Sequence, residues 1–89
     1  MNDKSIHCKV LYDTNLSVKA KLLMIFLLQV NEEVESDDLD ISINFLCKAL
    51  NYSNKTVIKA IQELEDKGYI NKAKRGPKGN IYNIVREGR

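Results

Sequence analysis

A cluster of polar side chains with no acidic residue among them occupies residues 53–59. Its members carry hydroxyl, amide and ammonium groups: Ser53, Asn54, Lys55, Thr56 and Lys59. An asparagine amide can pair with the edge of adenine, and a lysine ammonium can reach guanine acceptors or phosphates. These groups suit contact with a nucleic acid if one surface displays them together. The ordinary alternative is a solvent-exposed helix face, which also tends to be rich in lysine.

A second cluster is basic and surrounds a turn. Its members are Lys72, Lys74, Arg75 and Lys78. The turn itself is Gly76-Pro77-Lys78-Gly79, whose glycine and proline residues favour a tight bend. Exposed lysines can also protect strand edges from aggregation. Because edge protection needs no concentration of charge at the turn, the cluster favours contact with a phosphate backbone or a minor groove.

The first cluster shares one face only if residues 55–67 form a helix. A stripe at the i, i+3, i+4 and i+7 spacing of a buried helix face is formed by Val57, Ala60, Ile61 and Leu64. Most of the polar cluster then points outward. Ser53 is the expected N-cap, and Gly68 fits the left-handed position beyond the helix end. A shorter helix at 42–50, capped by its first residue, precedes the turn at 51–54.

Two β-type runs follow, at 69–74 and 81–85, and they place the basic cluster at the tip of a hairpin. Helix, tight turn, helix and basic hairpin is the order of a winged helix-turn-helix, which presents one helix to a DNA groove. The length of 89 residues suits one modest core. We therefore expect a single domain over residues 1–89, mainly α with a small β-hairpin (α+β), made of three helices plus a wing.

The first of these helices is expected from its N-cap, Ser17, to about Asn31. Apolar residues occur on nearly every side of it, and Leu22–Leu28 is an unbroken apolar run. Such a helix must be covered on more than one face. A homodimer would cover it with a two-fold interface. The alternative is cover by the N-terminal arm, residues 1–15, in which Ile6–Tyr12 is expected to be a strand or extended.

Charge is divided unevenly along the chain, although the formal net charge is only +2. Six of the twelve acids fall between Glu32 and Asp40, within a segment, residues 31–41, that we expect to be a solvated loop. From Ile41 to Arg89 there are ten bases against four acids, a net charge of +6. A basic half with an acidic loop elsewhere suits a polyanionic partner on one face.

The sequence gives little indication of a metal site, an enzyme active site or a membrane segment. Cys8 and Cys47 are widely separated, and His7 cannot form a zinc site with Cys8 alone. With one histidine, no phosphate-binding glycine loop and no nucleophile motif, the sequence argues against an enzyme, and no cofactor is expected. The apolar run is far shorter than the roughly 20 residues that span a bilayer, and the N-terminus does not resemble a signal peptide. We therefore expect a cytoplasmic protein without membrane contact.

Four segments carry a family resemblance: Leu16–Leu23, Leu46–Ser53, Lys55–Ile61 and Leu64–Ile70. They resemble the winged-helix domains of bacterial, plasmid and phage replication proteins. Asn51 departs from the glycine that many relatives have in the turn, but asparagine tolerates left-handed backbone geometry. Similar domains also serve as transcriptional repressors and as centromere-binding adaptors of plasmid partition systems, and the fold does not choose among these roles.

The sequence thus predicts specific binding of double-stranded DNA by a homodimer in a bacterial, plasmid or phage system. The role would be in replication, partition or transcription control, and the resemblance allows a protein partner in a replication or partition complex. The alternative is a winged-helix protein-interaction module that docks through the acidic loop or the wing. Varying the salt concentration in a DNA-binding titration separates the two, because phosphate contacts make affinity depend on salt.

Overall fold

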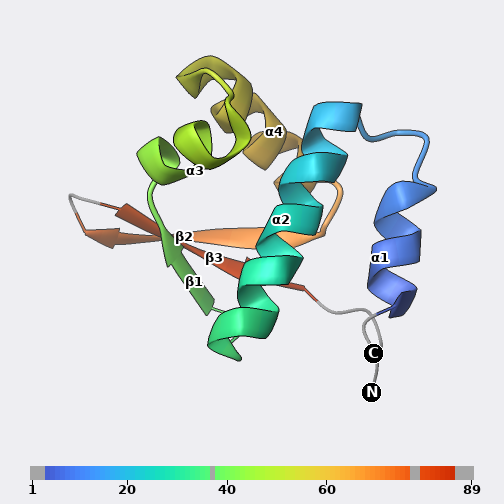
Figure 1. Ribbon diagram of the computed structural model, residues 1–89, viewed down its shortest axis with the longest axis horizontal. Helices are drawn as coiled ribbons and strands as arrows, with labels where there is room; N and C mark the ends of the chain where they lie inside the picture. Colours follow the sequence, from blue (N-terminus) through green and yellow to red (C-terminus); the bar gives the residue numbers. More distant parts are fainter. Residues whose placement is uncertain (1–3, 37, 77–78, 86–89) are drawn as a thin grey trace.

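The computed structural model describes residues 4–36, 38–76 and 79–85 (Figure 1), with side chains described at 6, 8–36, 38–72 and 81–85. In chain order the elements are α1 (Lys4–Leu11), α2 (Val18–Val34), β1 (Asp38–Ile41), α3 (Ile43–Leu50), α4 (Asn54–Asp66), β2 (Ile70–Gly76) and β3 (Gly79–Ile84). A small antiparallel sheet accompanies the helices, which confirms the expected α+β class and winged-helix arrangement. The described residues form four helices, one more than the sequence predicted.

The predicted C-terminal hairpin is present, and a third strand joins it. β2 pairs with β3 antiparallel, with Lys72 opposite Tyr82. β1 pairs with the other side of β3, with Leu39 opposite Tyr82, so β3 is the central strand. A register shift between Lys74 and Gly76 marks the approach to the turn. Both hairpin strands extend closer to the turn than the sequence predicted.

The prediction that residues 31–41 form a loop was wrong. α2 continues through Val34, and β1 occupies Asp38–Ile41. Leu39 is buried between two exposed aspartates, which is the period-two pattern of a strand covered on one face. So short and acidic a run carries a weak strand signal by itself. Its structure comes from pairing with β3 and from the burial of Leu39, both of which are tertiary effects.

The prediction of a strand or extended arm at Ile6–Tyr12 was also wrong. These residues fall mostly within α1, which packs beside α2 (Figure 1). Ile6 and Val10, one helical turn apart, are buried in the core. A helix of this length is marginal in isolation, so packing rather than local propensity explains it. The N-terminal segment thus covers part of α2 within one chain.

Serine caps fix the starts of three helices, as predicted. Each serine oxygen accepts a hydrogen bond from the backbone N–H three residues later, at 3.2 Å for Ser17, 3.0 Å for Ser42 and 3.2 Å for Ser53. Each bond satisfies a donor that the helix start would otherwise leave unpaired. Gly68 follows α4 with a φ of 83°, the left-handed conformation expected there.

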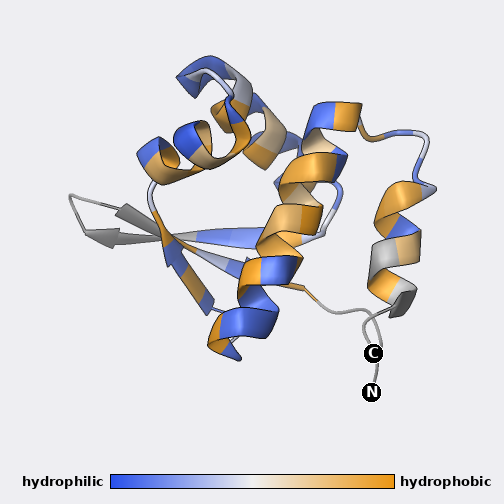
Figure 2. Ribbon diagram, viewed as in Figure 1, coloured by the Kyte–Doolittle hydropathy of each residue, from blue (hydrophilic) through white to orange (hydrophobic). Residues whose placement is uncertain are grey.

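The core lies among α2, α4 and the sheet. Completely buried side chains include Tyr82 of the central strand, Leu23 and Leu27 of α2, and Leu64 of α4. Figure 2 shows apolar residues along most of α2 and hydrophilic residues gathered toward its C-terminal end. Because α2 contacts α1, α4 and β1, it is the element against which α4 is held in place.

Candidate nucleic-acid interface

A tight turn joins α3 to α4 and sets where α4 begins. Asn51 closes α3 with a φ of 60°, and its backbone N–H donates to the Cys47 carbonyl. The Tyr52 N–H donates to the same carbonyl at 3.0 Å. Asparagine adopts this left-handed conformation at little cost, so the turn forms without a glycine at this position. α4 then starts at Asn54, one residue earlier than the sequence predicted.

α4 buries one face and exposes the opposite one. The predicted buried stripe is confirmed, because each of its four members is at most 3% exposed: Val57, Ala60, Ile61 and Leu64. The exposed side carries four residues at i, i+3, i+4 and i+7, namely Lys55, Ile58, Lys59 and Gln62. We call these four the outer face of α4. Together with Thr56 they line an open depression of about 380 Å³, and none of them is acidic.

The structure separates the five residues of the first predicted cluster. Lys55 and Lys59 lie exposed on the outer face. Ser53 and Thr56 stabilise the helix start, where their hydroxyl oxygens are hydrogen-bonded at 3.0 Å. Asn54 is exposed, and its Oδ1 accepts a hydrogen bond at 3.0 Å from a cysteine thiol of α3. Three of the five residues therefore help to anchor α4 to the preceding turn and helix.

Two members of the outer face were not among the predicted site residues. Helical spacing alone allows either Gln62 or Glu63 to point outward, and the structure exposes Gln62 and half-buries Glu63. Ile58 is 48% exposed, one of several large apolar side chains at the surface of this protein. Its spacing of three residues from Lys55 already placed it on this face.

Glu63 connects α4 to the start of α2. Its Oε2 accepts a hydrogen bond from the Ser17 backbone N–H at 2.6 Å, and its Oε1 accepts one from the Ser17 hydroxyl at 3.0 Å. A helix N-terminus favours a carboxylate, since its unpaired N–H groups and dipole are positive. The Glu63 charge is therefore directed toward α2, and it fixes α4 relative to that helix.

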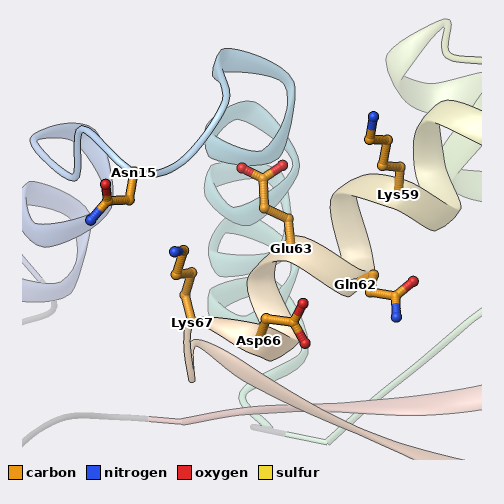
Figure 3. A pocket seen from close by; sticks show the side chains of 6 residues that line it. All are labelled: Asn15, Lys59, Gln62, Glu63, Asp66 and Lys67. Carbon is orange, nitrogen blue, oxygen red and sulfur yellow. The ribbon is translucent and has the colours of Figure 1, made fainter.

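A further depression, of about 490 Å³, lies beside the C-terminal half of α4 (Figure 3). Its lining residues are Asn15, Lys59, Gln62, Glu63, Asp66 and Lys67. Figure 3 shows Glu63 directed toward the start of α2 and Asp66 directed away from it. The formal charges of its two carboxylates and two ammonium groups sum to zero, so this depression has no net charge. Among the described side chains, no group of three or more His, Cys, Asp or Glu residues could hold a metal ion.

Only part of the predicted wing site can be described. Lys72 is exposed on β2. Lys74 and Arg75 lie further along β2, but their side chains are outside the described residues. Lys78 is outside them altogether. The backbone of β2 and β3 forms an antiparallel ladder up to Gly76 and Gly79, so Lys74 and Arg75 lie near the end of a hairpin, as the sequence predicted.

Tyr52 holds the turn against α2. Its hydroxyl donates to the Lys19 carbonyl at 3.1 Å, and the Lys19 ammonium lies 5.9 Å from the centroid of its ring. This distance is typical of a cation–π contact. Burial raises the pKa of Tyr52, which further favours the protonated, donating form of its hydroxyl. The turn, and with it the start of α4, is thereby attached to α2 at a second point.

Tyr69→Phe should raise the pKa of Asp13 toward its ordinary value of 3.8. The Tyr69 hydroxyl donates to Asp13 Oδ2 at 2.8 Å and is the main cause of the lowered pKa of Asp13, and the Asn15 N–H adds a second hydrogen bond at 2.9 Å. A lowered folded-state pKa contributes stability above the ordinary value, and this contribution is lost as the pH falls through the lowered one. Carbon-detected NMR titration of the Asp13 carboxyl measures the shift. An unchanged titration curve in the variant would show that Tyr69 does not control it.

Comparison with protein families agrees with this arrangement. A family model described as a helix-turn-helix domain matches residues 14–70, which is more than half of the chain and includes α2, α3 and α4. A comparison with curated proteins found no match. None of the helices in the described ranges is long and apolar enough to cross a membrane. The chain belongs to the helix-turn-helix domain family, a membership that suggests DNA binding.

Proposed function

We propose that this chain binds double-stranded DNA sequence-specifically, with α4 as the helix that enters the major groove. The observation that carries the proposal is the outer face of α4, which is exposed, free of acids and held by a helix-turn-helix. A major groove about 12 Å wide admits an α-helix. An ordinary surface helix explains the lysines equally well, but it does not explain their display by the second helix of this motif.

Each group on the outer face has a partner in the groove. The ammonium groups of Lys55 and Lys59 reach guanine acceptors or phosphates, and the Gln62 amide can pair with adenine. Asp66 follows Lys55 by eleven residues, about 16 Å along the axis at 1.5 Å per residue. The acid therefore lies at the far end of α4, away from the first turns that contact bases.

The wing supplies the second contact in this proposal. Its bases, Lys72, Lys74, Arg75 and Lys78, would hold the flanking phosphate backbone or minor groove. Such contacts strengthen binding to every sequence and make it dependent on salt. Base reading is thus assigned to α4 and electrostatic attraction to the wing.

The biological setting is proposed from the sequence resemblance. It favours a bacterial, plasmid or phage system in which the protein acts in replication, partition or transcription control, as a homodimer and with a protein partner where a larger complex forms. A two-fold dimer would place two α4 helices about one DNA turn apart, roughly 34 Å, so its target would contain paired half-sites.

Selection of bound sequences from a random DNA pool, followed by titration at several salt concentrations, tests the function. We expect an enriched motif, and an affinity that falls as salt rises because phosphate contacts release counterions. Binding without an enriched motif would remove the claim of sequence specificity. Absence of binding even at low salt would instead favour the protein-interaction module, with the exposed acids at the end of α2 as a docking surface.

Replacing one thymine of the selected site with deoxyuridine should weaken binding about fourfold if Ile58 contacts its methyl group. The methyl is the apolar group that a base presents in the major groove, and Ile58 is the apolar member of the outer face. Burying one such carbon contributes roughly 0.8 kcal/mol. Competition titration with each thymine replaced in turn measures the effect.

The Ile58→Ala variant is the control for this contact. It should bind thymine and deoxyuridine sites equally, because the side chain that detects the methyl has been shortened. If the variant and the original protein lose the same affinity on replacement of that thymine, another residue is responsible.

A further inference from the structure

One face of α2 remains apolar and exposed even though α1 covers part of this helix. Val18 and Leu22 are 78% and 49% exposed, and Phe26 and Val30 continue the same i, i+4 row as half-buried residues. Phe45 at the start of α3 is 52% exposed, and its ring centroid lies 6.2 Å from that of Phe26. The exposed apolar row of α2 therefore continues onto α3 through Phe45, and the two form one apolar surface.

The charges on α2 run opposite to those that stabilise an isolated helix. Lys19 and Lys21 lie at its N-terminal end, and Glu32, Glu33 and Glu35 lie at its C-terminal end. The helix dipole favours acids at the N-terminus and bases at the C-terminus, so each end carries the less favourable charge. An antiparallel helix with the same charges would put bases beside acids at both ends.

The spacing of residues along α2 has the symmetry that such a pairing needs. Lys19 precedes Phe26 by seven residues and Glu33 follows it by seven, which places all three on nearly one line of the helix surface. Leu22 and Val30 lie four residues before and after Phe26. A two-fold axis passing beside Phe26 would therefore set Leu22 against the partner's Val30 and Lys19 against the partner's Glu33.

We propose that the α2 face, formed by Val18, Leu22, Phe26, Val30 and Phe45, binds the same face of a second copy of this chain with the two α2 helices antiparallel. This goes beyond the homodimer of the proposed function by assigning its surface, orientation and register. Apolar side chains form the centre of the interface, and the Lys19–Glu33 pairs flank it and select the antiparallel direction. A C2 axis makes the contact self-complementary and closed.

Leu22→Glu tests the apolar centre of the interface. Sedimentation equilibrium over the micromolar range should show a dimer for the original protein. The dissociation constant of the dimer should rise at least about 100-fold in the variant, because the interface would bury two unpaired carboxylates. Leu11→Glu is the matched control: Leu11 is 52% exposed on α1, and its replacement should leave the dimer unchanged. Circular dichroism confirms that each variant is folded.

Charge reversal tests the orientation. Lys19→Glu and Glu33→Lys should each weaken the dimer about fivefold by placing like charges together, and the double variant should recover most of the loss. A monomeric original protein, equal effects of Leu22→Glu and Leu11→Glu, or no recovery in the double variant would overturn the proposal. DNA binding at single half-sites would persist in each of these outcomes, so failure here is distinct from failure of the DNA-binding proposal.

Discussion

Lys55→Ala combined with Lys59→Ala should weaken binding to the selected DNA site by at least about 30-fold. Each lost base or charge-assisted contact costs about 1 kcal/mol or more, and two such losses multiply. Both ammonium groups are exposed on the outer face of α4, opposite the buried stripe, so their removal leaves the core untouched. Fluorescence anisotropy with labelled duplexes measures the affinity.

The ratio of specific to random-sequence binding shows whether these lysines read bases. Affinity for random DNA should fall less than affinity for the selected site, because only the selected site offers the base partners. Lys9→Ala, which removes an exposed base on α1, serves as a control for overall charge and should change both affinities little. Equal losses on the two DNAs would mean that α4 holds the backbone without reading sequence.

The wing variant Lys74→Ala, Arg75→Ala, Lys78→Ala should flatten the plot of log affinity against log salt concentration by about 2.7 units. Each phosphate contact contributes roughly 0.9 to that slope, and three bases are removed. The loss should be similar for selected and random DNA, in contrast to the effect of the α4 variant. A slope identical to that of the original protein would show that the wing does not touch the duplex.

Features that depend on neighbouring residues could be predicted from the sequence. The caps at Ser17, Ser42 and Ser53 and the buried stripe of α4 follow from hydrogen bonds and spacing within one or two helical turns. The position of the wing follows in the same way from a turn between two β-type runs. The two lysines of the outer face could be found because the stripe fixes which side of α4 is exposed.

Features that depend on distant parts of the chain were missed. α1 and β1 take their structure from α2 and β3, and neither has a strong local pattern. The contact between Ser17 and Glu63 joins residues 46 positions apart, so no periodicity reveals it. Ile58 is a different case: it was not among the predicted site residues, although its spacing of three residues from Lys55 is local and places it on the outer face.

The burial of Ile6 and Val10 has a consequence for how this domain folds as a unit. We expect the cooperative folding unit to include α1 as well as the helix-turn-helix and wing, because these two side chains belong to the same core as α2. A fragment beginning at Leu16 would retain every proposed DNA contact, yet it would uncover apolar surface that α1 protects. Its weakness would be aggregation during folding rather than loss of DNA-contacting groups. The minimal binding surface and the minimal folding unit of this protein are therefore different segments of the chain.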